Sequence, residues 1–204
     1  STLKQITPGN VSKLKRAWTY DTGDVSGGFR PWEVTPLVLD GVMYFNTTGA
    51  KIVALDADKG TEIWAFELKT VTPGRFSTRG ISYWPGTAAT GPRIVATTST
   101  GMMLQLDMKT GQLVKGFGKD GVLNLKAGVA DQFGATAGYN LEAPPAIYKN
   151  LAIFAPASGE QGRYGMPGDP RAIDLVTGEQ VWRFHSVPQP GEPNFGTWGP
   201  DGWQ

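Results

Sequence analysis

Short apolar segments alternate with short polar turns along most of the chain. Each apolar segment is only a few residues long, is rich in Val, Ile, Leu and aromatic side chains, and stops at Gly, Asp, Asn or Pro. This pattern predicts β-strands joined by tight turns rather than amphipathic helices. The predicted strands form three groups of four: 34–39, 42–46, 51–56 and 62–66; 80–84, 92–98, 102–107 and 113–117; 143–148, 151–156, 171–174 and 180–184.

The last two strands of each group are joined by a repeated turn sequence. In the third group this sequence is Ala-Ile-Asp-Leu-Val-Thr-Gly-Glu-Gln-Val-Trp, residues 172–182. The middle copy departs from the other two, with Gln105 in place of Ala and Lys115 in place of Trp. Asp and Thr side chains cap a tight turn and Gly tolerates positive φ, so these residues suit a hairpin. The aligned positions are Asp56, Asp107 and Asp174; Gly60, Gly111 and Gly178; Phe66, Phe117 and Phe184.

A repeat built from short strands is typical of a β-propeller or another β array. We therefore predict an all-β fold, a β-propeller of four-stranded antiparallel blades, of which about three are present. The high content of Gly (28) and Pro (15) agrees with many turns. Residues 16–20 alternate like a strand that could close the ring. The predicted parts are 1–24 with this closing strand, 30–68, 79–118 and 141–185 as blades, and 186–204 as a connection to the next blade.

Composition excludes several classes of site. The formal net charge is +1, which gives no basis for binding nucleic acid. The chain has no Cys, so disulfides, thiolate metal sites and Cys nucleophiles are excluded. A single histidine, His185, rules out a multi-histidine metal site and leaves one candidate for a Ser-His-Asp triad; we interpret it as a rim residue. No apolar run approaches the roughly 20 residues of a transmembrane helix.

Strand order predicts which connections share a face of the disc. In an up-and-down blade the repeated turns lie on one face, while the segments before each first strand lie on the other with the loops after each second strand. That second face carries Glu33, Arg79 and Glu160, near the axis because the first strand is innermost. Two carboxylates and an arginine suit an anionic ligand bound with a hard cation such as Ca²⁺. A salt-bridged rim without a ligand fits the same residues.

The turn repeat resembles the tryptophan-docking motif of the pyrroloquinoline quinone (PQQ)-dependent dehydrogenases, Ala-x-Asp-x-x-Thr-Gly-x-x-x-Trp. Residues 172–182 match it fully, and residues 54–64 match except for Lys59 at the Thr position. Segments 14–23, 33–38, 79–84, 158–160, 184–188 and 197–198 are also similar to stretches of that family. The resemblance implies the N-terminal part of an eight-bladed propeller, in which each motif Trp stacks against the neighbouring blade.

The resemblance also implies a cofactor site for PQQ and Ca²⁺. Glu33 would contact the quinone, Arg79 would lie near its oxygens, and Ser158 and Gly159 would line the cofactor, while Glu160 would ligate Ca²⁺. The stretch 158–160 is one residue shorter than is usual in the family. The family's general base, an Asp, comes from a later blade. No catalytic residue is therefore assigned here, and the chain alone is expected to be an inactive fragment.

By the same resemblance, the activity would be oxidation of an alcohol, polyol or sugar, with electrons passed to ubiquinone or cytochrome c. The partners would be the remaining blades of the same propeller, and the location would be the periplasm. The vicinal Cys pair that covers the quinone in many alcohol-oxidising members would fall near residues 73–74 and is absent, as in members acting on sugars or polyols.

A second interpretation is a non-catalytic propeller of the same repeat type that serves as a scaffold in envelope protein assembly. Such a scaffold needs the turn repeat but has no need for Glu33, Arg79 and the 158–161 loop on one face. Their occurrence together favours the enzyme.

Overall fold

Three four-stranded antiparallel sheets make up the fold in a computed structural model, which describes residues 4–24, 32–131, 139–157 and 166–198. Three 3-10 turns lie outside the sheets of this described part: η1 (Val11–Lys13), η2 (Leu68–Thr70) and η4 (Phe195–Thr197). None of its helices is long and apolar enough to cross a membrane. The strands, in sheet order, are β1 (Leu37–Leu39), β2 (Val42–Asn46), β3 (Lys51–Asp56) and β4 (Glu62–Glu67); β5 (Ser82–Trp84), β6 (Arg93–Thr97), β7 (Met102–Asp107) and β8 (Val122–Asn124); β9 (Ala146–Tyr148), β10 (Leu151–Phe154), β11 (Arg171–Asp174) and β12 (Gln180–Arg183).

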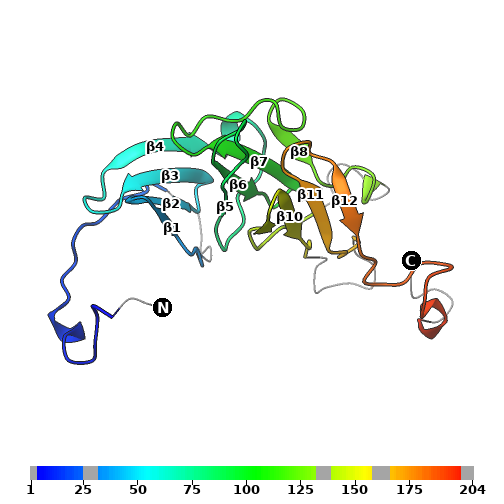
Figure 1. Cartoon of the computed structure of the whole chain (residues 1–204), viewed down its shortest axis with the longest axis horizontal. Helices are drawn as coiled ribbons and strands as arrows, with labels where there is room; N and C mark the ends of the chain where they lie inside the picture. Colours follow the sequence, from blue (N-terminus) through cyan, green and yellow to red (C-terminus); the bar gives the residue numbers. More distant parts are fainter. Residues whose placement is uncertain (1–3, 25–31, 132–138, 158–165, 199–204) are drawn as a thin grey trace.

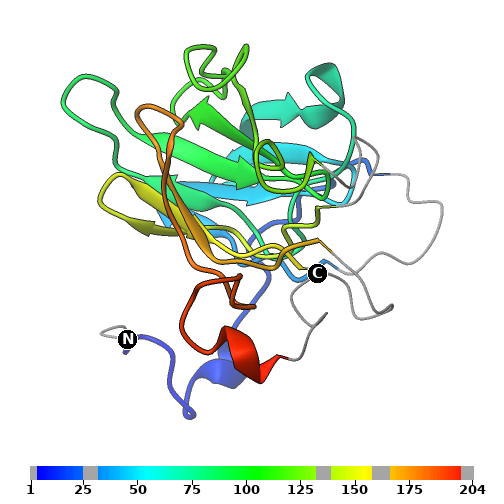
Figure 2. The same ribbon diagram turned by 90° about the vertical axis from the view of Figure 1, so that its right-hand side faces the viewer.

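The three sheets are propeller blades that stand side by side in an arch (Figure 1). The first strand of each blade lies toward the concave side, and β4 and β8 lie toward the convex side. The N-terminal and C-terminal segments leave from opposite ends of the arch, and Figure 2 shows the same arrangement from its end. The prediction of an all-β propeller with about three blades is confirmed.

The hydrophobic core lies between the blades. In β3 and in β7 four consecutive residues are buried, because each of these strands is covered on both faces. Ile52 and Ala54 face the second blade, while Val53 and Leu55 pack on the other side beneath Trp18 and other residues of the N-terminal part. A strand buried on both faces loses the alternation of apolar and polar residues, which explains the continuous apolar runs in the sequence.

Each repeated turn is held by the same local contacts. The side-chain oxygen Oδ1 of the turn Asp accepts hydrogen bonds from the backbone N–H groups two and three residues later, at 2.7–3.1 Å in the three copies. The turn Gly has positive φ in all three copies. Burial raises the pKa of the Asp107 carboxyl, but hydrogen bonds from Thr110 and Lys109 and the charge of Arg93 outweigh it and leave the pKa below its usual value.

A hydrogen bond crosses from each turn to the preceding part of the chain. The residue after the turn Asp bonds through its N–H within its own blade, and its carbonyl faces the neighbour. The indole nitrogens of Trp18 and Trp64 donate to two of these carbonyls, those of Ala57 (3.0 Å) and Met108 (3.2 Å). Each indole also lies directly over the turn glycine. The first blade is joined in this way to the N-terminal segment and to the second blade.

The junction of the second and third blades uses a different donor. The carbonyl of Leu175 accepts a hydrogen bond of 2.7 Å from the side-chain Nε2 of Gln105, and both residues are buried. Lys115, at the Trp position of the middle copy, is exposed. The buried guanidinium of Arg171 adds hydrogen bonds to the Leu125 carbonyl (2.6 Å) and to the Tyr139 hydroxyl (2.5 Å). The two departures of the middle copy are therefore linked, since Gln105 replaces the missing indole donor.

One predicted strand is wrong. Residues 113–117 do not form the fourth strand of the second blade; Leu113 makes only an isolated bridge to Leu106, and the chain then leaves the sheet through Gly116 and Gly118. The fourth strand is β8, which pairs with β7 beyond residue 118. A strand of three residues is too short to show a hydrophobic period, so the residue pattern does not predict β8. The other eleven strands are present, several of them shorter at one end than predicted.

The N-terminal segment is not part of any of the three sheets, and its role as a strand that closes the ring stays a prediction, because that strand would complete the last blade. It pairs with no strand in the described part of the chain, and its side chains hold it instead: Trp18 through the bond described above, and the Tyr20 hydroxyl through a hydrogen bond to the Glu62 carboxylate. Burial, followed by this bond and the charge of Glu62, raises the pKa of Tyr20 to about 12.

Two equivalent turn glycines provide a test of the packing between blades. Gly111 has φ of 68°, and a Cβ there would lie 2.6 Å from the ring of Trp64; Gly178 has φ of 79°, and a Cβ there would have no neighbour nearer than 3.7 Å. Both Ala substitutions carry the left-handed backbone cost of about 1–2 kcal/mol. Gly111→Ala should lower the free energy of unfolding by about 1–3 kcal/mol more, because of the overpacking against Trp64. Urea unfolding of the full-length protein checks this, and equal losses would contradict it.

Candidate functional site

The segments that precede the first strands of the first two blades are joined backbone to backbone. The N–H of Glu33 donates to the carbonyl of Thr78 (3.2 Å), and that of Thr35 donates to the carbonyl of Arg79 (3.4 Å). Gly80 has φ of 125°, and a Cβ there would lie 3.3 Å from the carbonyl oxygen of Thr35. The close approach of the two backbones therefore depends on glycine at this position.

This junction brings Glu33 and Arg79 together. The Arg79 Nε lies 3.3 Å from the Glu33 Oε2, and the side chains are 58% and 59% exposed, respectively. An ion pair with this exposure contributes little to stability. The terminal nitrogens of Arg79 have no hydrogen-bond partner among the described residues, so they are available to an anionic ligand.

The segment before the third blade joins the same cluster. The carbonyl of Glu142 accepts hydrogen bonds from the Ser77 hydroxyl and from the N–H of Arg79, the latter at 3.2 Å. The carbonyl of Asn140 accepts a hydrogen bond of 2.8 Å from the N–H of Ala157, directly before the loop predicted to bind the cofactor. The start of that loop is therefore hydrogen-bonded to the same segment, 140–142, that accepts a hydrogen bond from Arg79.

Ser158, Gly159 and Glu160 lie outside the described residues, so their part in the site stays a prediction. Within the described residues, no three His, Cys, Asp or Glu side chains gather closely enough to hold a metal ion.

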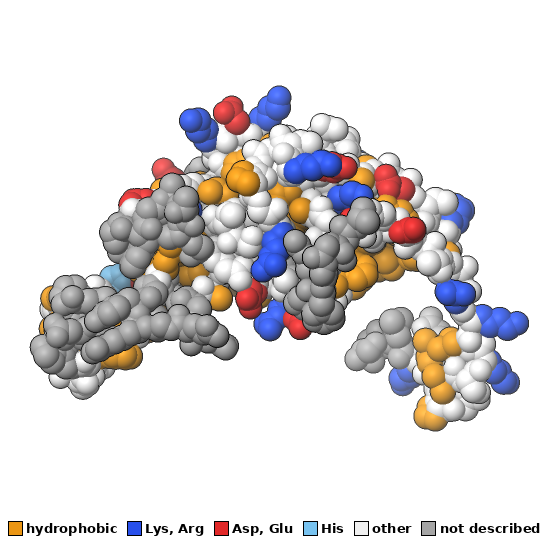
Figure 3. All heavy atoms as spheres, turned by 180° about the vertical axis from the view of Figure 1, so that it is seen from behind, with side chains coloured by type: hydrophobic (Ala, Val, Ile, Leu, Met, Phe, Trp, Pro, Cys, Tyr) orange, Lys and Arg blue, Asp and Glu red, His pale blue; other side chains and the backbone are white. Residues whose placement is uncertain are grey.

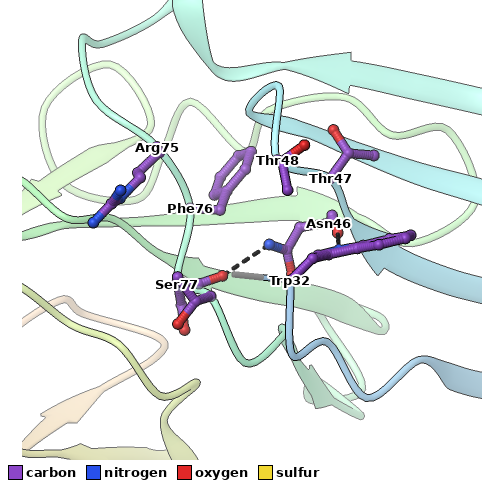
Figure 4. A pocket seen from close by; sticks show the side chains of 8 residues that line it. Trp32, Asn46, Thr47, Thr48, Arg75, Phe76 and Ser77 are labelled. Carbon is purple, nitrogen blue, oxygen red and sulfur yellow. Dashed lines mark hydrogen bonds between the residues drawn. The ribbon is translucent and has the colours of Figure 1, made fainter. Parts of the chain in front are cut away.

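A small pocket lies between the first and second blades, lined by residues 46–48 of the first blade, by Trp32 and by the 75–78 segment (Figure 4). The buried side chain of Asn46 donates from Nδ2 to the Ser77 carbonyl (2.8 Å), and the Asn46 carbonyl accepts a hydrogen bond of 2.8 Å from the Trp32 indole. Its Oδ1 is buried without a hydrogen-bond partner. The centre of a water molecule can occupy a volume of about 20 Å³ in the pocket. This is room for about one water and not for a cofactor. The pocket is therefore too small for a large ligand, and the Asn46 side chain in it holds the Ser77 segment in place.

Charge on this side of the molecule is mixed. Figure 3 shows acidic and basic side chains close together on the lower margin of the arch. The joined segments carry the charges of Glu33, Arg79 and Glu142, and the exposed Arg75 lies on the same segment as Arg79. Sequence reasoning found the first two from topology and missed Glu142 with its neighbour Asn140, because neither belongs to a repeated motif.

His185 lies apart from these residues, in the segment after β12. Its Nδ1 is 2.7 Å from Oε1 of Glu192, and no serine hydroxyl contacts its ring in the part of the chain that the structure describes. The backbone N–H of Gln189, followed by His185, lowers the pKa of the Glu192 carboxyl. These contacts agree with the interpretation of a rim histidine and show no triad.

Comparison with known proteins identifies the relatives of this chain. The family profile described as "PQQ: Glucose/ethanol/alcohol dehydrogenase, beta-propeller domain" matches residues 1–204. The dehydrogenase subunit of the alcohol dehydrogenase (quinone) of Gluconobacter oxydans is 34% identical over 93% of this chain and 23% of the relative. The quinoprotein glucose dehydrogenase of Escherichia coli is 32% identical over 95% of this chain and 26% of the relative.

The fold shows the same relationship. The crystal structure of the quinohemoprotein alcohol dehydrogenase from Comamonas testosteroni superposes with a TM-score of 0.70 and 28% identity, covering 95% of this chain and 26% of that one. The chain thus spans about a quarter of the length of these relatives.

Two substitutions separate a binding role for Arg79 from a structural one. Arg79→Gln should change the free energy of unfolding by less than about 0.5 kcal/mol, because the ion pair it breaks is exposed. Ser77→Ala, which removes the buried hydroxyl that donates to Glu142, should lower it by about 0.5–1.5 kcal/mol. Urea titration of both variants beside the wild type checks this. A loss above about 1 kcal/mol in Arg79→Gln would identify the pair as a structural element of the rim.

Proposed function

Because the chain belongs to the PQQ β-propeller family of glucose, ethanol and alcohol dehydrogenases, we propose that it supplies one side of the cofactor site of a PQQ-dependent dehydrogenase. The observation that supports this most directly is the convergence of three joined segments on the exposed pair Glu33–Arg79. A propeller used only as a scaffold has no need to leave an arginine with unoccupied donors at this point.

The residues present fit an anionic quinone. Arg79 offers two terminal nitrogens in a planar fork, the geometry that matches a carboxylate or adjacent quinone oxygens. Glu33 orients the guanidinium through its ion pair and accepts a hydrogen bond from Nε. When bound, PQQ accepts two electrons from the substrate, and the protein orients it and tunes its electronics. Arg79 would stabilise the negative charge that develops on the quinone oxygens.

Calcium belongs to the same proposal. Ca²⁺ takes oxygen ligands, and Glu160 follows directly on the loop that begins beside Asn140. We place Ser158 and Gly159 against the cofactor and Glu160 on the cation. In the family the general base is an Asp of a later blade, so substrate oxidation would require the full-length protein.

The proposed substrate is an alcohol, polyol or sugar, and the absence of Cys near residues 73–74 favours a polyol or sugar. The proposed electron acceptor is ubiquinone or cytochrome c, in the periplasm. The remaining blades of an eight-bladed ring are the proposed structural partner. Trp182 supports this last point: it aligns with Trp64, its side chain has no hydrogen-bond partner among the described residues, and it is 37% exposed beside the exposed Phe184.

Cofactor binding tests the enzyme against the scaffold. Titration of the full-length protein with PQQ in the presence of Ca²⁺ should quench the tryptophan fluorescence to saturation. Arg79→Gln should raise the Kd by about tenfold or more, because a charge-assisted bidentate contact is lost. Arg16→Gln is the matched control, since Arg16 is exposed in the N-terminal segment and forms no hydrogen bond or ion pair with Glu33 or Arg79. Absence of quenching at saturating PQQ would favour the scaffold.

A further inference from the structure

Arg171, the first residue of β11, is a buried cation without a carboxylate partner among the described residues. Its side chain donates only to neutral groups. Apart from Tyr139, the groups whose charge acts on it are Arg183 and Asp169, which form an ion pair of their own at 2.7 Å. Burial lowers the pKa of the guanidinium, because removal from water disfavours the charged form. A buried charge is costly unless a group of opposite charge balances it.

The guanidinium also has N–H groups to spare. Its Nη2 donates to the Leu125 carbonyl and to the Tyr139 hydroxyl, and its Nη1 donates to Oε1 of Gln180 at 3.2 Å. A guanidinium carries five N–H donors. The Nε is buried without a hydrogen-bond partner, and Nη1 keeps a second N–H. The ring centroids of Tyr139 and Phe154 lie 5.5 and 5.1 Å from the guanidinium carbon, but an aromatic face supplies neither a hydrogen-bond acceptor in the guanidinium plane nor a full negative charge.

A pocket lies against this side chain, between the loop after β8 and the hairpin β11–β12, which lie side by side (Figure 1). The centre of a water molecule can occupy about 280 Å³ of this pocket, compared with about 20 Å³ in the pocket beside Asn46. Gln180 and Leu125, the residues that bind the two terminal nitrogens of Arg171, both line it. The terminal nitrogens therefore lie at the pocket wall, and the volume accommodates a small organic molecule.

The other polar groups of the lining can act as donors. Asn124 accepts a hydrogen bond of 3.0 Å at Oδ1 from the N–H of Lys126, and its Nδ2 has no partner among the described residues. Gln180 is exposed, and rotation of its amide would present Nε2 in place of Oε1. Among the described residues the lining holds no Asp or Glu, so its only charge is that of the arginine. In the flanking segments Lys126 and Asp131 carry opposite charges, and Glu179 is exposed in the repeated turn.

We propose that this pocket binds a small aliphatic carboxylate, which is held by Nη1 of Arg171 and by the amide of Gln180. The carboxylate takes the place of Oε1 of Gln180 at Nη1 and supplies the counter-charge that the buried guanidinium lacks. Leu125, Val129 and Ile173 form apolar parts of the wall, so a ligand with a short hydrocarbon chain buries more apolar surface than a bare ion does. The site lies beside the outer strands β8 and β12 and does not depend on the proposed function.

The test is isothermal titration calorimetry of the full-length protein with butyrate, acetate and butan-1-ol. Butyrate should bind saturably at one site. Acetate should bind about threefold or more weakly, because two methylene groups are lost, and butan-1-ol should show no saturable binding, because it carries no charge. Absence of saturable butyrate binding overturns the proposal, as does binding of butan-1-ol with the same affinity. Equal affinities for acetate and butyrate would contradict the part assigned to the apolar wall.

Gln180→Glu places a carboxylate of the protein itself beside Nη1 of Arg171. This variant should bind butyrate about tenfold or more weakly and should unfold at a higher urea concentration, since the buried charge gains a permanent partner. Gln112→Glu is the matched control, because Gln112 is exposed in the repeated turn of the second blade and adds the same charge. It should leave the butyrate affinity and the urea midpoint unchanged.

Arg79→Gln separates this pocket from the candidate cofactor site and should bind butyrate as the wild type does. Loss of butyrate binding in Arg79→Gln would place the ligand at the Glu33–Arg79 pair and overturn the proposal. Butyrate binding by Gln180→Glu equal to that of the wild type, or a lower urea midpoint in that variant, also overturns it. Each of these outcomes leaves the test of PQQ binding unaffected.

Discussion

One carbonyl in each blade must find a hydrogen-bond donor in the preceding part of the chain, and much of the structure depends on this requirement. It belongs to the residue after the turn Asp, and its position is set by the Asp side chain, the left-handed Gly and the N–H bond within the blade. A buried carbonyl without a donor would cost about 1–3 kcal/mol. The donors that meet the requirement, Trp18, Trp64 and Gln105, also hold adjacent units of the arch together.

The candidate site is a consequence of this packing, at the ends of the strands opposite to the repeated turns. Once neighbouring blades are held side by side, the segments before their first strands lie within backbone hydrogen-bond distance of each other. Backbone groups and the Ser77 hydroxyl make these joints, so Glu33, Arg79 and Glu142 keep their charged ends exposed. The stability of the arch and the chemistry of its concave margin thus rest on different atoms of the same segments.

Sequence patterns predicted most of the fold because each blade repeats the same strands and the same turn. The turn Asp and Gly mark a hairpin three times, and the resulting strand order predicts that Glu33 and Arg79 lie on one face of the disc. The patterns failed to predict the features that occur in one blade only. β8 is too short to show a hydrophobic period. Lys115 stands at the Trp position of the repeat, but the repeat pattern does not reveal that the chain has left the sheet there. Asn46, Asn140 and Glu142 escaped notice because their partners are backbone groups or each other, far from any motif.

The use of Gln105 as the donor in place of an indole couples several positions of the middle repeat. Three departures occur together in the middle repeat: Gln in place of Ala, Lys in place of Trp, and a fourth strand moved from 113–117 to β8. Restoring Trp at 115 alone would introduce a second donor from a segment that no longer lies in the sheet, and restoring Ala at 105 alone would leave the Leu175 carbonyl bare. Neither change restores the junction by itself, so residues 105 and 115 act as one unit in holding the second and third blades together.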